Sequence, residues 1–232
     1  MKDFYHKLDI AINENEVGKL IKTYRGDSTL TYQVNPSPIR MDEKASESLS
    51  EIYNKSLGQF PYKQEDGEEG LFLAQEIAFT GIIDEDHRLI KDFIMGETGS
   101  KDMCDWDEGN LMELSYEKAK ESNSKIVLGH THPVIFPLKG EKRQYGALPS
   151  CISYTKKDIT KYVLDTKISD SMLKSKVYEK YWGDYCELFT RAKEIDEVSN
   201  FAMIVSPALD QFGIFEVKKK GRVIYHPLKI GN

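Results

Sequence analysis

Two histidines have the spacing that most clearly suggests chemistry. The run KIVLGHTHP, residues 125–133, places His130 and His132 two positions apart where an apolar stretch ends, and Pro133 follows. On a β-strand, residues i and i+2 face the same side, so both imidazoles can converge on one cation. Roughly a few chains per thousand of this composition would carry the pattern by chance. It favours a metal site, although two neighbouring surface histidines would also satisfy it.

A second candidate is the run Thr155-Lys156-Lys157-Asp158, where a helix is expected to begin. Asp158 could supply an oxygen ligand to a metal, and the Thr155 hydroxyl could donate to an oxyanion during hydrolysis. The same spacing also fits a helix N-terminal capping box. On these four residues alone, capping is the favoured interpretation.

The third candidate is Glu76, inside the apolar run LFLAQEIAFTGII, which predicts one buried strand over 71–83. A carboxylate among apolar residues must be paired, exposed at a sheet edge, or used in chemistry, because burying it alone costs several kcal/mol. Edge exposure is the simple interpretation. The functional one is a general base that takes a proton from an attacking water.

Taken in this order, the three features resemble the JAMM or MPN+ zinc metalloproteases, also called JAB-domain proteins. The resemblance covers about residues 70–160. It implies that His130, His132 and Asp158 hold Zn2+, that Glu76 is the catalytic proton shuttle, and that Thr155 is the oxyanion donor.

The chain departs from the family pattern in two ways. The family usually has Ser where this chain has Thr155, and it has a much shorter spacing between the HxHP proline and that Ser than the 21 residues, 134–154, found here. Ser150 or Ser153 could supply the hydroxyl instead. A Thr hydroxyl donates the same hydrogen bond, so Thr155 remains the expected donor.

The resemblance implies a zinc-dependent metalloprotease that hydrolyses peptide or isopeptide bonds, with the C-terminus of a ubiquitin-like modifier as the expected substrate. Such a tail would bind by strand addition beside the metal. Two alternatives stay open: the same zinc site acting on a short peptide or small-molecule amide, and a metal-free MPN-like binding module. Cys151 as a protease nucleophile lacks a supporting local signature.

Composition narrows the functional classes. The chain has 232 residues, a net charge of −6 and 40% hydrophobic residues, which is typical of a soluble globular protein. The acidic balance disfavours nucleic acid as a partner, and Lys218–Lys220 is expected to be a solvated hairpin end. No run approaches the roughly 20 apolar residues that span a bilayer, and no signal segment opens the chain, so a cytoplasmic protein without a membrane partner is expected.

The pattern of elements predicts a mixed α/β fold: a curved, mainly antiparallel sheet with flanking helices, the JAB/MPN (cytidine-deaminase-like) architecture that the resemblance implies. We expect an N-terminal arm with one or two strands over 1–42 and one domain over 43–232, with insertions at about 134–154, as an irregular loop, and 166–198. The expected helices cover 46–57, 107–122, a stretch from near Thr155 or Asp158, and 171–197. The expected strands, besides 71–83, cover 88–95, which forms a hairpin with 71–83, then 125–129, 201–207, 212–221 and 222–230, the last two as a second hairpin.

Overall fold

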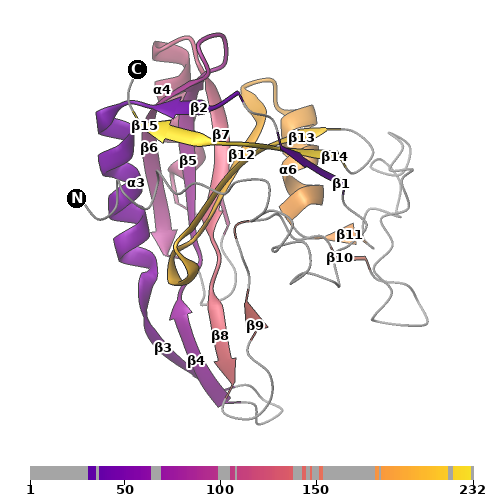
Figure 1. Ribbon diagram of the computed structural model, residues 1–232. Helices are drawn as coiled ribbons and strands as arrows, with labels where there is room; N and C mark the ends of the chain where they lie inside the picture. The colour runs from indigo at the N-terminus through magenta and orange to yellow at the C-terminus, as the bar shows by residue number, and fades with distance from the viewer. Residues whose placement is uncertain are drawn as a thin grey trace.

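The computed structural model (Figure 1) describes residues 31–34, 37–63, 69–98, 105–107, 109–137, 143–144, 147, 152–153, 181–182, 184–218 and 222–230. They form a mixed α/β fold, as predicted. The helices are α3 (Glu43–Ser56), α4 (Leu111–Glu121), α6 (Asp184–Glu194) and the 3-10 turn η2 (Pro207–Leu209). The strands are β1 (Thr31–Val34), β2 (Ile39–Met41), β3 (Leu57–Lys63), β4 (Glu69–Ala74), β5 (Ile77–Asp84), β6 (Leu89–Thr98), β7 (Lys125–Thr131), β8 (Val134–Pro137), β9 (Arg143–Gln144), β10 (Ile152–Ser153), β11 (Tyr181–Trp182), β12 (Val198–Ser206), β13 (Gln211–Lys218), β14 (Arg222–His226) and β15 (Leu228–Ile230).

The main sheet is strongly curved and almost closes on itself. Its nine strands lie in the order β1-β14-β13-β12-β7-β5-β6-β2-β15. β14 and β15 lie at opposite ends of this order, yet only Pro227 separates them in the chain, so the two edges must approach each other. The carbonyl of Pro227 accepts a 2.8 Å hydrogen bond from Ile39 of β2. The expected curvature is confirmed, but the sheet is more mixed than expected, because four of its eight strand pairs are parallel.

The two faces of the sheet are covered by different helices, and side chains alternate between them. On the central strand β5, Ala78 and Ile82 pack in the cluster that contains residues of α4 and α6, while Phe79 and Ile83 pack in the cluster that contains residues of α3. β5 is therefore apolar on both sides. Its one buried hydroxyl, on Thr80, lies 2.6 Å from that of Ser115 on α4.

The same alternation orients β7, which runs beside β5. Ile126 and Leu128 face the α4 and α6 side, whereas Val127 faces the α3 side. The same alternation orients the next residues of β7. The side chain of His130 faces the α6 side, and that of Thr131 faces the α3 side.

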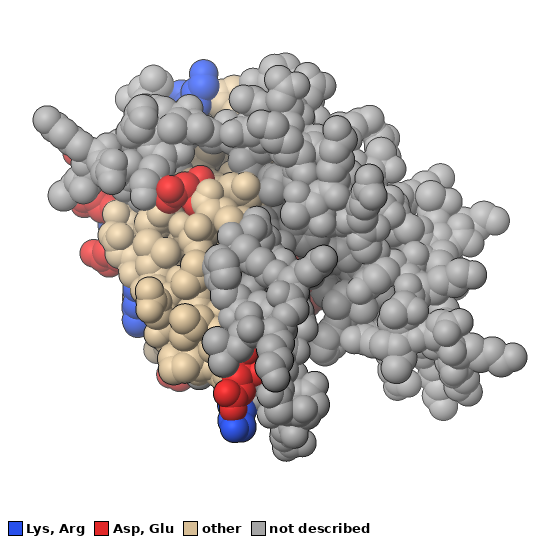
Figure 2. Space-filling view, turned by 60° about the horizontal axis from the view of Figure 1, so that its bottom comes forward, with Lys and Arg blue, Asp and Glu red and all other residues tan. Residues whose placement is uncertain are grey.

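A second, four-stranded sheet, ordered β3-β4-β8-β9, extends from one end of the main sheet (Figure 1). β3 and β4 expose Leu57 and Leu71 to about a third of their possible area. Figure 2 brings this end of the molecule forward and shows a broad uncharged area with a few charged residues at its margin.

The strand expected over 71–83 is two strands of different sheets. β4 ends at Ala74, β5 begins at Ile77, and Gln75 and Glu76 join them without strand pairing. The backbone of Gln75 bonds instead to Ser56, since its N–H donates to the Ser56 carbonyl at 3.0 Å. The run is apolar on both sides of Gln75 and Glu76, so the pattern predicts one strand where the chain has two.

The N-terminal helix differs from its prediction mainly at its start. It begins at Glu43, and its cap is Asp42, whose carboxylate accepts a 2.8 Å hydrogen bond from the N–H of Ala45. The helix expected over 107–122 is confirmed as α4, and both expected hairpins form, β5–β6 and β13–β14.

The expected helix over 171–197 is wrong in its middle, because β11 pairs there with β10 and α6 begins only at Asp184. The expected loop over 134–154 begins with a strand, β8, that pairs with β4. The helix expected from Thr155 lies outside the described residues.

Within the stretch expected as an arm, β1 and β2 are strands of the main sheet, paired with β14 and β6. No helix in the described part of the chain is both long enough and apolar enough to cross a bilayer.

Candidate metal centre

The end of β7 carries both histidines of the HxHP sequence. His130 pairs with Ala78 of β5 on one side and with Ile204 of β12 on the other, and the N–H of His132 donates to the Val205 carbonyl at 2.7 Å. The backbone is thus held on both sides, and the two rings lie on one face with centroids 4.7 Å apart. Pro133 then ends the strand, since it has no N–H to pair.

Gly129, directly before His130, is fixed by close packing. A Cβ at this position would lie 2.2 Å from Cε2 of Phe79 and 2.9 Å from the Met203 carbonyl oxygen. Only glycine lets Phe79 close over the strand here, so the residue that precedes the first histidine is set by the core of the sheet.

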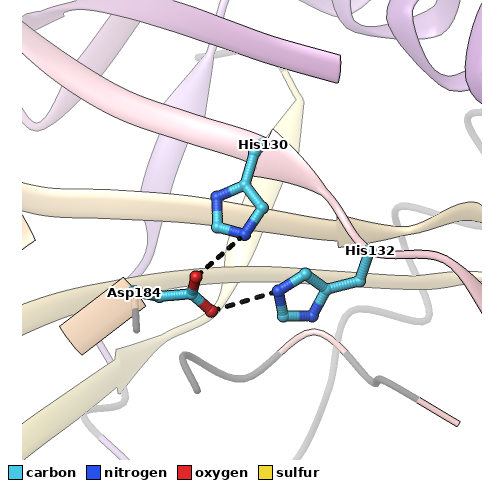
Figure 3. Close-up of side chains that lie close together, drawn as sticks. All are labelled: His130, His132 and Asp184. Carbon is cyan, nitrogen blue, oxygen red and sulfur yellow. Dashed lines mark hydrogen bonds and ion pairs between the residues drawn. The ribbon is translucent and has the colours of Figure 1, made fainter. Parts of the chain in front are cut away.

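Asp184 completes a group of three possible metal ligands with His130 and His132, and their ligand atoms lie within 4.8 Å of one another. Nε2 of His130 lies 3.3 Å from Oδ1 of Asp184, and Nε2 of His132 lies 3.1 Å from Oδ2. Figure 3 shows the carboxylate between the two rings, with one oxygen toward each.

The distances fit a shared cation. Donors bound to one tetrahedral Zn2+ at about 2.0–2.2 Å lie about 3.3–3.5 Å apart, close to the two nitrogen–oxygen distances found here. Two imidazoles and one carboxylate are also a common zinc donor set, with a fourth position left for water or substrate. The donor set therefore fits a divalent metal ion.

The electrostatics of the group favour a positive charge at its centre. Both histidine side chains are only 4% exposed. Burial alone would lower the pKa of His130, but the charge and hydrogen bond of Asp184, with the charges of Glu76 and Glu187, raise it to about 9. Burial alone would raise the pKa of Asp184, but the two histidines hold it well below its ordinary value. The group could therefore hold a positive charge at its centre, as a proton or as a metal ion.

Glu76 lies near the candidate metal centre, directly before β5. The last backbone pair of β5 with β7 is Ala78 with His130, so Glu76 and His132 each lie two residues beyond that pair. Glu76 belongs to the segment that joins β4 to β5 and is not itself paired in the sheet. Its charge contributes to the raised pKa of His130, so the carboxylate lies within electrostatic reach of the group.

Behind His130, Trp106 and Arg191 connect the β-sheet to α6. The Trp106 ring lies edge-on to His130 with centroids 5.6 Å apart, and its N–H lies 2.9 Å from the Gly129 carbonyl oxygen. Arg191 stacks on Trp106 at 5.6 Å and donates two hydrogen bonds to the Asp107 carboxylate, at 2.9 and 2.7 Å. Arg191 and Asp184 belong to one helix, so these contacts set where Asp184 stands.

Another carboxylate, Glu187, stands one helical turn after Asp184. It accepts a 3.2 Å hydrogen bond from Nε of Arg191, and burial raises the pKa of its carboxyl. Its charge in turn contributes to the raised pKa of His130. The first turn of α6 thus brings two acids to the β7 histidines, near the positive end of the helix dipole.

Of the five predicted site residues, the structure brings His130 and His132 together, and Glu76 lies within electrostatic reach of His130. Asp158 and Thr155 lie outside the described residues, as does Ser150. Ser153 belongs to β10, which pairs with β11.

The sequence prediction missed Asp184, 52 residues after His132. The available signal was an acid that opens a helix directly after Gly183, with basic residues near the helix end. Because 171–197 was taken as one continuous helix, Asp184 fell inside an element instead of at its start.

No protein-family model matches the chain, and a search of curated proteins finds no match either.

Proposed function

We propose that this protein is a zinc-dependent hydrolase of peptide or isopeptide bonds, of the JAMM type that its sequence resembles. The observation that supports it is the group of His130, His132 and Asp184, whose ligand atoms lie within 4.8 Å of one another, with the charge of Glu76 within electrostatic reach of His130. This is the residue set the resemblance implies, except that Asp184 replaces Asp158 as the acid that opens a helix.

In this proposal each residue has one task. His130, His132 and Asp184 would hold Zn2+, which when bound would act as a Lewis acid and lower the pKa of water, so that the water can lose a proton and attack a carbonyl near neutral pH. Glu76 takes the proton from the attacking water and gives it to the amine when the C–N bond breaks. Water thus adds to the acyl carbon and a free amine leaves, so atoms and charge balance.

The resemblance also implies a hydroxyl that donates to the oxyanion. With Asp184 as the ligand, the residue three positions earlier is Tyr181, not Thr155. A phenol, like a Ser or Thr hydroxyl, can donate to an oxyanion. Tyr181 therefore joins Thr155, Ser153 and Ser150 as a candidate donor, to be separated by mutation.

The substrate class follows from the resemblance alone: a ubiquitin-like modifier joined through its C-terminal glycine to an amine. A short peptide or a small-molecule amide at the same site is the second candidate. A panel with both kinds of substrate, each releasing a fluorescent amine, separates them.

The test combines metal content with turnover. Protein purified with zinc present should hold about one Zn2+ per chain by elemental analysis. Glu76→Gln should keep that metal and lose about 10²- to 10⁴-fold in kcat, the usual contribution of a general base. Glu97→Gln, which changes an exposed carboxylate on β6, is the matched control and should retain both. No bound metal would instead support the binding-module alternative, and full turnover in Glu76→Gln would show that another residue is the base.

A further inference from the structure

A buried hydroxyl lies between the two histidines, on the opposite side of the strand. Thr131 is fully buried and turns away from the metal ligands toward Ser56, the last residue of α3. Its Oγ1 lies 3.1 Å from Oγ of Ser56. Strand alternation thus places a hydroxyl pair directly behind the candidate metal centre.

Thr131 continues the pairing of β5 with β7 beyond the point where the backbone pairing ends. The last backbone pair is Ala78 with His130. At the next position, Oγ1 of Thr131 accepts a 2.9 Å hydrogen bond from the N–H of Ile77 and donates a 2.7 Å hydrogen bond to the carbonyl of Gln75.

These two bonds hold Glu76 from both sides. The Gln75 carbonyl belongs to the peptide plane before the Glu76 Cα, and the Ile77 N–H belongs to the plane after it. One side chain therefore holds both planes, and the two planes define the φ and ψ of Glu76. The direction of the Glu76 side chain depends on those two angles.

Ser56, at the end of α3, also binds the segment Gln75–Glu76 that joins β4 to β5, called the β4–β5 joint below. Its Oγ lies 2.7 Å from the Gln75 carbonyl oxygen, and its own carbonyl accepts the N–H of Gln75 at 3.0 Å. The hydroxyl has a single proton, so it donates either to Gln75 or to Thr131. In either case the end of α3 and the end of β7 hold the β4–β5 joint together.

We propose that Thr131, supported by Ser56, is a positioning residue that holds the Glu76 carboxylate in place for proton transfer. This inference rests on the proposed function, since it assigns Glu76 the role of base. Thr131 contacts neither metal nor substrate; it acts through the backbone of Glu76.

The main variant is Thr131→Val, which keeps the shape of the side chain and removes the hydroxyl, and Thr131→Ser is its matched control. Thr131→Val should keep one Zn2+ per chain and an unchanged KM, and lose about 10- to 100-fold in kcat, part of the general-base contribution. Thr131→Ser should restore most of the rate. A Thr131→Val kcat within twofold of wild type, or loss of the metal, would overturn the proposal.

A double mutant separates positioning from general loss of structure. If Thr131 acts through Glu76, adding Thr131→Val to Glu76→Gln should lower kcat by less than twofold further, because the group being positioned is already inactive. If the loss of kcat in the double mutant instead equals the product of the losses in the two single mutants, the proposal is overturned. Ser56→Ala is the second variant should Thr131→Val fold poorly, with the same pattern and a smaller loss expected.

Amide exchange at Ile77 gives a readout that needs no turnover. Loss of its acceptor in Thr131→Val should speed exchange of the Ile77 N–H at least about tenfold, and Thr131→Ser should leave it slow. If the wild-type protein cleaves none of the substrates, the proposed function fails. In that case amide exchange still tests whether the Thr131 hydroxyl binds the Ile77 N–H. Unchanged exchange in Thr131→Val would show that it does not.

Discussion

Two buried histidines, His130 and His226, have similar surroundings. Both are nearly inaccessible, and each has one ring nitrogen without a hydrogen-bond partner among the described residues, Nδ1 in His130 and Nε2 in His226. Each also has a carboxylate oxygen nearby, Asp184 at 3.3 Å and Glu216 at 3.6 Å. Burial and an acidic neighbour alone would mark both as functional.

The difference lies in the arginine of each region. At His226, Nη2 of Arg88 lies 2.8 Å from Nδ1 of the ring, and the same nitrogen donates to the Ser37 carbonyl at 2.9 Å. The chain itself supplies the cation, and the cluster joins the β5–β6 turn to the end of β14.

In the region of His130 the arginine is Arg191, which contacts Trp106. The charge of Arg191 is neutralised by ion pairs with Asp107 and Glu187. The His130 ring instead shares the Asp184 carboxylate with His132. Burial therefore does not distinguish the two histidines. At His226 an arginine of the chain supplies the positive charge, whereas at His130 the positive charge would have to be a proton or a bound metal ion.

The largest expected effect comes from changing the carboxylate at His130 to an amide. Asp184→Asn keeps the shape but removes the negative charge and one anionic ligand. We expect zinc affinity to fall about 10³-fold, more than the 10- to 100-fold typical of outer-shell partners. Competition with a chromogenic chelator measures this directly.

The matched change at His226 is Glu216→Gln, which should leave zinc affinity unchanged within about twofold, because Arg88 already supplies the cation there. If Asp184→Asn and Glu216→Gln behaved alike, the two histidine regions would not differ in the way described.

A smaller effect is expected from the two arginines. Arg191→Met removes the paired hydrogen bonds to Asp107 and loosens the contact between α6 and Trp106, so zinc affinity should fall about tenfold, the lower range for an outer-shell residue. The control, Arg88→Met, removes the donor to the buried ring nitrogen of His226, and should cost about 1–3 kcal/mol of unfolding free energy with zinc affinity unchanged. Chelator competition and urea unfolding of both variants test this crossed pattern, and a loss of zinc affinity in Arg88→Met would contradict it.

The histidine part of the site could be predicted from sequence because it is local. Strand alternation and a terminating proline need only the residues from 125 to 133. The third candidate ligand could not be assigned in this way, because Asp158 stands where a helix is expected to begin, whereas Asp184 stands inside the helix expected over 171–197. Only the tertiary packing that places α6 beside Trp106 brings Asp184 to the histidines.

The break in the predicted strand over 71–83 has a similar cause. Gln75 and Glu76 are adjacent polar residues in this run, but polar residues also occur on paired strands, so their type alone does not mark them as unpaired. The hydroxyls of Ser56 and Thr131, which come from distant parts of the chain, take the place of strand partners there. Local patterns thus predicted the element types and the curved sheet, while the joint that carries Glu76 depends on side chains that no local window contains.

The smallest expected effect is a dependence of stability on pH whose sign reports what occupies the centre. In chelator-treated protein, the raised pKa of His130, about 9, means that its pairing with Asp184 stabilises the fold fully below the unfolded pKa of about 6.5. That contribution is lost as pH rises through 9. It should be on the order of 1 kcal/mol, because desolvation offsets much of the pairing. Urea midpoints at pH 6, 7.5 and 9.5 measure it, and His130→Gln should remove the dependence of stability on pH.

With saturating zinc the slope of stability against pH should reverse, since protons compete with the metal and zinc binding strengthens as pH rises. A falling slope both with and without zinc would mean that the proton, and not the metal, is the cation that this centre holds.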